Sequence, residues 1–144
     1  LIGYPVPNQI FTTPVSVRFK DIDALGHVNN AVIITYFEEG RKAFFLDHFQ
    51  DGDPTAFNFI LARIESDFLH PVRLTHTPEV RRWVEFVGQT SFGFIYELAD
   101  PQNTDTLLAR GRSVQVCFDY AKREKTPVPA AMQQVLNAYL VDGA

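Results

Sequence analysis

Residues 21–30 read DIDALGHVNN, and residues 31–49 continue as AVIITYFEEGRKAFFLDHF. Apolar side chains recur on nearly every face of the second stretch, which predicts a long, mostly buried helix over residues 30–49. Asp21, Asp23 and a Gly turn come directly before it. The first N–H groups of a helix have no intrahelical partner and favour negative charge, so this junction brings carboxylates next to open donors. Acyl-transfer chemistry uses that combination, and we place the candidate active site here.

Length and charge set limits on the rest of the molecule. The chain has 144 residues, 46% of them hydrophobic, and a formal net charge of −4. We therefore expect one globular domain over residues 1–144 with a sizeable core. No long stretch has an excess of Lys and Arg, which argues against nucleic acid as a partner. The short basic groups at Arg81-Arg82 and at residues 122–125 are expected at most to meet phosphates.

The single cysteine and the apolar runs indicate a compartment. Cys117 alone cannot form an internal disulfide, and its apolar strand-like surroundings predict a small core residue rather than a catalytic thiol. No apolar run approaches transmembrane length, and the N-terminal LIGYPVPNQI lacks the pattern of a signal peptide. We therefore expect a soluble cytoplasmic protein without a membrane partner.

Apolar segments divided by turn signals predict the strands. Val15, Val17 and Phe19 alternate with polar residues after Pro14, which is the period of a half-buried strand. Further strands are expected at residues 57–68, 80–87, 92–98 and 107–118. The connections GQTS, at residues 88–91, and DPQNTD, at residues 100–105, are short and turn-like, so the sheet should be antiparallel.

The predicted fold class is α+β, with one long helix packed on one face of a five-stranded antiparallel sheet. Residues 129–144 suit a short C-terminal helix. Gly40 inside the long helix costs about 1 kcal/mol relative to Ala. Close approach of the helix to a strand would account for that glycine.

The pattern V-x-x-R-F-x-D-x-D-A-x-G-H-V-N-N, with Y-F-E-E-x-R after it, covers residues 15–41. It resembles the signature of hotdog-fold acyl-CoA thioesterases of the 4-hydroxybenzoyl-CoA thioesterase family, and looser similarity continues to Pro129. The resemblance implies a hotdog fold, in which the sheet wraps around one long central helix. It also implies hydrolysis of an acyl-CoA thioester to free acid and CoA. Residues 32–35 depart from the pattern, because many relatives place a Tyr there, and this bears on the acyl group rather than on the reaction.

The resemblance also assigns roles within the loop. Asp23 occupies the position of the catalytic carboxylate, acting either as nucleophile through a mixed anhydride or as general base on water. The backbone N–H groups of Val28, Asn29 and Asn30 are the candidate oxyanion donors, and that of Asn30 matches the position that polarises the carbonyl. His27 is a further catalytic candidate that could donate to the thioester, with a hydrogen bond to backbone as the alternative.

Other residues are expected to support the loop or contact substrate. Asp21 is interpreted as a structural loop acid, and Gly26 as a residue in a backbone conformation closed to other residues. Glu38 could reach the substrate or a residue that contacts it, although a solvated or subunit-facing acid is the favoured interpretation. Thr90 and Ser91 belong to a hairpin that the family places near the bound thioester, although they also suit an ordinary turn.

The remaining binding predictions concern CoA itself. Arg110 and Arg112 flank Gly111 on the strand that the family places near the pantetheine tunnel, so they are the preferred cations for the CoA phosphates. The four histidines lack metal-ligand spacing, and no glycine-rich loop is present to cradle a nucleotide. We expect no metal and no cofactor, with CoA entering only as part of the substrate.

Two alternative functions stay open. A hotdog-fold hydratase or dehydratase would share the architecture, but it usually pairs its acid and His in a different loop pattern. A non-catalytic module that binds acyl-thioesters or lipids would use the same helix end, and the presence of Asp23 argues against it. Exposed sheet edges are normally paired or covered, and the resemblance implies assembly into dimers that can pair again. We therefore expect a homodimer, with a homotetramer as a further step.

Overall fold

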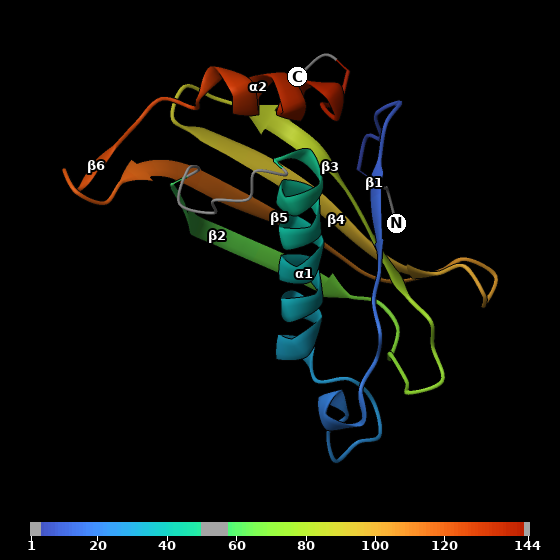
Figure 1. The fold of residues 1–144 in the computed structure, drawn as a ribbon. Helices are drawn as coiled ribbons and strands as arrows, with labels where there is room; N and C mark the ends of the chain where they lie inside the picture. The colour runs from blue at the N-terminus through green and yellow to red at the C-terminus, as the bar shows by residue number, and fades with distance from the viewer. Residues whose placement is uncertain (1–3, 50–57, 143–144) are drawn as a thin grey trace.

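The computed structural model describes residues 4–49 and 58–142, and Figure 1 shows the order of their elements. The strands are β1 (Phe11–Pro14), β2 (Phe59–Phe68), β3 (Glu79–Val87), β4 (Ser91–Asp100), β5 (Thr106–Asp119) and β6 (Glu124–Lys125). The helices are α1 (Asn30–His48), α2 (Ala130–Ala138) and the short 3-10 helix η1 (Phe19–Asp21).

The strands form one antiparallel sheet. Its order is β1-β3-β4-β5-β2, and the short β6 pairs with β5. The long helix α1 crosses one face of this sheet, and α2 lies near the end at which α1 finishes (Figure 1). The predicted α+β hotdog architecture, with one long helix on an antiparallel sheet, is confirmed.

Aromatic contacts fix the direction of α1 along the sheet. Phe37 stacks on Tyr96 of β4 with ring centroids 4.9 Å apart. Farther along the helix, the ring centroid of Phe45 lies 6.5 Å from that of Phe92, which is near the start of β4. The helix therefore runs antiparallel to β4. Its first turn lies at the end of the sheet where β4 finishes, and the β3–β4 hairpin lies toward its last turn.

The glycine inside α1 has the cause that the sequence suggested. A Cβ atom at Gly40 would lie 2.8 Å from Cγ1 of Val80 on β3, which is shorter than an ordinary van der Waals contact. Gly111 on β5 faces the helix in the same way, since a Cβ there would lie 2.9 Å from the Phe37 ring. Glycine at both positions lets α1 approach the sheet closely, as the sequence analysis inferred for Gly40.

The first strand was predicted in the wrong place. β1 ends at Pro14, which pairs with Glu79, and the alternating residues that follow do not form a strand. Only the N–H of Val15 continues the pairing, by donating to the carbonyl of Pro78. β3 begins at Glu79, so no partner strand is available for residues 16–20. Phe19, expected in a half-buried strand, is 83% exposed in η1.

The burial of α1 also differs from the prediction, because the helix covers the sheet with one side only. Arg41, a charged residue within the helix, is buried, and its Nη1 donates to the hydroxyl of Tyr96 over 3.2 Å. That hydroxyl lies 2.6 Å from Oγ of Ser113, which accepts from Nε2 of Gln115. Leu46 is 64% exposed. The helix–sheet interface therefore contains a buried polar cluster that periodicity did not indicate.

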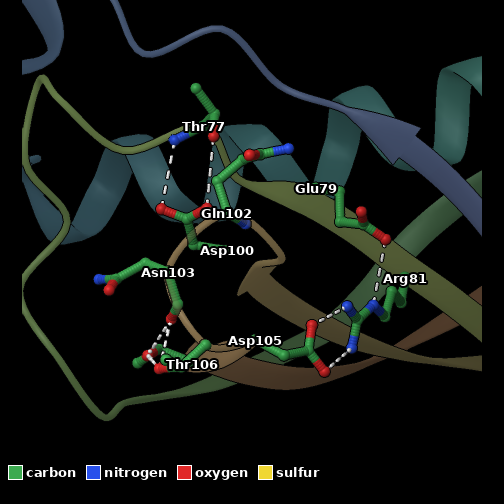
Figure 2. A network of polar contacts seen from close by, with 9 residues as sticks. Thr77, Glu79, Arg81, Asp100, Gln102, Asn103, Asp105 and Thr106 are labelled. Carbon is green, nitrogen blue, oxygen red and sulfur yellow. Dashed lines mark hydrogen bonds and ion pairs between the residues drawn. The ribbon is translucent and has the colours of Figure 1, made fainter.

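The two arginines of the basic pair on β3 lie on opposite faces of the strand. Arg82 is 1% exposed, and the centre of its guanidinium lies 3.7 Å from the centroid of the Phe44 ring. Burial lowers the pKa of Arg82 to about 9. Arg81 lies on the other face of the strand in ion pairs with Glu79 and Asp105 (Figure 2). Arg82 is therefore not available to a phosphate, because it lies in the core, and Arg81 already has two acidic partners.

Candidate active site

The loop before α1 is a closed turn. Ile22 and Val28 form an antiparallel bridge at its base, and the N–H of Asp23 donates to the carbonyl of His27 over 3.0 Å. The N–H of Gly26 donates back to the carbonyl of Asp23. Gly26 has a φ of 85°, a left-handed conformation that favours glycine, so its predicted backbone conformation is confirmed.

Asp23 is half-buried at the start of this turn. One oxygen of its carboxylate, Oδ1, accepts a hydrogen bond from the N–H of Leu25 over 2.9 Å. Aspartate commonly bonds the backbone two residues on in this way. Within the described part of the chain, the other oxygen has no hydrogen bond. The turn therefore fixes the orientation of the carboxylate and leaves one oxygen open for chemistry.

The structure narrows the set of oxyanion donors. The N–H of Val28 donates to the carbonyl of Val72 over 2.7 Å, and that of Asn29 donates to the carbonyl of Asp21 over 3.1 Å. Both groups are therefore committed to the protein's own carbonyls and cannot also stabilise a substrate oxygen. Of the three candidate N–H groups, that of Asn30 is left.

Over the part of the chain that the structure describes, the hydrogen bonds at the N-terminal cap of α1 also leave the N–H of Asn30 unpaired. Asn29 is the N-cap, and its side-chain oxygen accepts from the N–H of Ala31 over 2.8 Å. The next two N–H groups, of Val32 and Ile33, donate to the carbonyl of Asn29. Among the described residues, only Asn30 has an unpaired N–H at this helix start, where the helix dipole favours negative charge.

A polar network at the C-terminal end of β4 fixes the connection between β2 and β3, which contacts the active-site loop through the carbonyl of Val72. Val72 and Thr77 both belong to this connection, which runs from the end of β2 at Phe68 to the start of β3 at Glu79. The carboxylate of Asp100 accepts from the N–H and hydroxyl of Thr77, at 3.4 and 3.3 Å, and from the N–H of Gln102 (Figure 2). The connection that supplies the Val72 carbonyl is thereby tied to the sheet.

Asp21 is a buried structural acid, as the sequence analysis interpreted it. Its Oδ2 accepts from the hydroxyl of Tyr36 over 2.7 Å and from the N–H of Arg18 over 3.0 Å. Burial raises the pKa of Asp21, but these hydrogen bonds and the charges of Arg18 and Lys20 together outweigh burial and hold the pKa below its ordinary value. Burial and the neighbouring carboxylate raise the pKa of Tyr36. Nothing in the sequence pattern indicated this role for Tyr36.

Two other candidates lie at or near the loop. His27 is half-buried, and among the described residues its ring makes no hydrogen bond, so the alternative of a ring bonded to backbone is not seen. Glu38 is exposed on α1, and its nearest cationic partner is Arg41 at 3.8 Å. Glu38 is therefore a solvated surface acid in the single chain.

The hairpin candidates lie elsewhere. Thr90 and Ser91 lie at the β3–β4 turn, where Ser91 accepts from the N–H of Gly88. Since α1 runs antiparallel to β4, this turn is near the last turn of the helix rather than the first. Within one chain the structure does not bring Thr90 and Ser91 next to Asp23.

The candidate CoA-binding cations also lie away from the loop. Gly111 faces α1, and successive residues of a strand point to opposite faces, so Arg110 and Arg112 lie on the face of the sheet opposite the helix. Arg112 pairs with Glu85 at 2.9 Å, and Arg110 pairs with Asp67 at 3.5 Å. The structure therefore does not place this pair beside Asp23, and both guanidinium groups already have acidic partners.

The described residues contain neither a metal-binding cluster nor a helix that could span a membrane. No group of three or more His, Cys, Asp and Glu side chains gathers there in a way that could hold a metal ion. Neither of the α-helices described has the length and apolar character needed to cross a membrane.

Comparison with known proteins identifies the family of this chain. Residues 17–136 match the model of the thioesterase-like superfamily. The chain belongs to this superfamily. The acyl-CoA thioester hydrolase YbgC of Escherichia coli O157:H7 is 24% identical over 128 residues, which cover 87% of this chain and 94% of that protein. The sequence-based prediction of a thioester hydrolase is thereby confirmed.

Solved structures agree. A thioesterase from Thermus thermophilus, complexed with coenzyme A and Zn, is 30% identical with a TM-score of 0.78 and covers 89% of this chain and 92% of its own. A predicted thioesterase from Bacillus stearothermophilus is 26% identical with a TM-score of 0.83, and the match covers 92% and 97% of the two chains. The hotdog-type thioesterase fold is therefore shared over nearly the whole chain.

Proposed function

We propose that this thioesterase hydrolyses acyl-CoA thioesters to a free acid and CoA at the junction of Asp23 and Asn30. The observation that carries the proposal is the unpaired N–H of Asn30, at a helix start that directly follows the turn containing the open carboxylate oxygen of Asp23. The acyl-CoA activity named for YbgC and the coenzyme A complex of the Thermus thermophilus relative support CoA as the leaving group.

The geometry supports a simple reaction. The carbonyl oxygen of the thioester accepts from the Asn30 N–H, which together with the helix dipole stabilises the developing oxyanion. Asp23 either takes a proton from the attacking water or attacks the carbonyl carbon itself to form a mixed anhydride, which water then hydrolyses. In both routes the C–S bond breaks, the acyl carbon gains a hydroxyl group, and the CoA sulfur gains a proton. The half-buried His27 is the proposed donor to that sulfur. The scheme uses no metal or further cofactor.

A thiol-release assay over a panel of acyl-CoA substrates tests the reaction. We expect free CoA and free acid to appear in equal amounts with at least one acyl group. Hydration of an enoyl-CoA without thiol release would favour the hydratase alternative. Tight binding of acyl-CoA with neither product would favour the binding module, and either of these outcomes would contradict the proposal.

We also propose that the enzyme assembles through the edge of its sheet. β2 lies at the end of the strand order and pairs with β5 on one side. It exposes Ile60, Leu61 and Phe68 to extents of 37%, 44% and 40%. Exposed edges with apolar side chains are normally paired or covered, so a two-fold homodimer joined along β2 is expected, with pairing into a homotetramer as a further step. Light scattering at micromolar concentration should give the mass of a dimer or tetramer, and a monomer mass would contradict the proposal.

A further inference from the structure

Asp21 connects the active-site turn to two parts of α1. Its backbone carbonyl accepts from the N–H of Asn29, the residue before the helix, over 3.1 Å. Its carboxylate accepts from the hydroxyl of Tyr36 over 2.7 Å. Tyr36 lies about 9 Å beyond Asn30 along the helix axis. One residue therefore fastens the base of the turn both to the helix start and to a point farther along the same rigid helix.

The connection lies inside the protein. Asp21 is 5% exposed and Tyr36 is fully buried, so water cannot substitute for either partner. A hydrogen bond to a charged group is stronger than one between neutral groups, and a buried carboxylate that loses a donor keeps its desolvation cost. The N–H of Arg18 donates to the same oxygen, Oδ2, and fixes the carboxylate from the side of the incoming chain.

The Asp21–Tyr36 hydrogen bond joins the two segments that carry the groups used in the proposed reaction. Asp23 follows Asp21 by two residues, and Asn30 belongs to the helix that carries Tyr36. We propose that the Asp21–Tyr36 hydrogen bond sets the position of the Asp23 carboxylate relative to the Asn30 N–H, which makes Asp21 and Tyr36 positioning residues. The inference rests on the proposed function. Because a misplacement of about 1 Å can cost about a hundredfold in rate, a small shift of the turn is enough to matter.

Loss of the Asp21–Tyr36 hydrogen bond should also change how activity depends on pH. Burial raises the pKa of Asp21, while the hydrogen bonds from Tyr36 and Arg18 and the charges of Arg18 and Lys20 lower it, with a net lowering. Glu39, the other charged group near Tyr36, is paired with Arg18 at 3.1 Å. Removing the Tyr36 hydroxyl leaves burial with less opposition, so the pKa of Asp21 rises. In the variant, the Asp21 carboxylate is therefore protonated at a higher pH than in the wild-type enzyme.

Tyr36→Phe tests the proposal, with Tyr139→Phe as the matched control. Tyr139 is also a buried tyrosine with one side-chain hydrogen bond, to Nε2 of His48 in the last turn of α1. We expect Tyr36→Phe to lower kcat about ten- to a hundredfold with little change in KM, and to move the acid limb of the kcat–pH profile to higher pH. Tyr139→Phe should lower Tm to a similar extent without moving kcat or the acid limb.

The results that would overturn the proposal are distinct from a failure of the proposed function. A Tyr36→Phe protein with reduced Tm but wild-type kcat and acid limb would show a purely structural role. If Tyr36→Phe does not fold, Asp21→Asn and Asp21→Ala decide, because Asn retains an acceptor for the Tyr36 hydroxyl. Asp21→Asn should then keep about tenfold more kcat than Asp21→Ala, and equal values would overturn the proposal. Failure of the proposed function would appear instead in the wild-type enzyme, as no thiol released from any acyl-CoA.

Discussion

Replacing Asp23 with Asn should lower kcat for acyl-CoA hydrolysis by at least about a hundredfold, the usual scale for loss of a general base or nucleophile. The amide oxygen of Asn can still accept from the N–H of Leu25, which the Asp23 carboxylate accepts over 2.9 Å, so the turn should keep its shape. The amide can neither take a proton from water nor attack the carbonyl. Thiol release at saturating substrate measures the effect, and the thermal unfolding midpoint reports whether the fold is retained.

Asp119→Asn is the matched control. The carboxylate of Asp119 accepts from the N–H groups of Ala121 and Lys122, at 2.9 and 3.0 Å, in the turn after β5. It therefore shares the backbone-bonding role of Asp23 without a place in the active-site loop. Asp119→Asn should leave kcat unchanged. A folded Asp23→Asn enzyme with near wild-type kcat would remove Asp23 from the mechanism.

The fold could be predicted where a segment is long and its pattern agrees with its neighbours. The helix over residues 30–49 and the four later strands match α1 and β2 to β5 within a few residues. The strand expected after Pro14 failed because the alternation of Val15, Val17 and Phe19 is a local signal. A strand also needs a partner, and β3 offers none beyond Glu79.

Burial of polar side chains could not be predicted, because it depends on partners distant in the sequence. Arg41 looks like a surface residue of a helix until the hydroxyl of Tyr96 is placed beneath it. On β5, the helix-facing positions include Ser113 and Gln115, which are buried, while the more apolar Val114 lies on the opposite face. Hydropathy alone selects the wrong face of that strand.

Some features of the candidate site could likewise be predicted from local sequence, and others depend on residues distant in the sequence. The loop motif predicted the turn at Gly26 and the start of α1, because turn and cap preferences are local. Which N–H stays open depends on the carbonyl of Val72, which arrives from a distant connection. The role of Asp21 likewise depends on Tyr36, and no spacing rule joins residues so far apart. Tertiary structure therefore reduced the three candidate donors to Asn30.

The Asn30 N–H can be removed with little disturbance of the helix. Asn30 is the first residue of α1, and proline is favoured at that position because its missing N–H has no helical partner to lose. The preceding residue, Asn29, already has φ of −60° and ψ of 139°, the extended conformation that a following proline requires. Asn30→Pro should therefore retain α1 while deleting the proposed oxyanion donor. Circular dichroism and the unfolding midpoint check that the helix and fold are intact.

We expect Asn30→Pro to lower kcat by about a hundred- to a thousandfold with little change in KM, because an oxyanion donor acts mainly in the transition state. Asn30→Ala is the comparison, since it removes the side chain and keeps the N–H, and it should retain about a hundred- to a thousandfold more kcat than the proline variant. Equal activity in the two variants would show that the N–H is not the donor. If the proline variant is much slower, the ratio of the two kcat values measures the contribution of one backbone hydrogen bond, expected at about 2.7–4 kcal/mol. That contribution would come from Asn30 alone, because the adjacent N–H groups of Val28, Asn29 and Ala31 are already bonded within the protein.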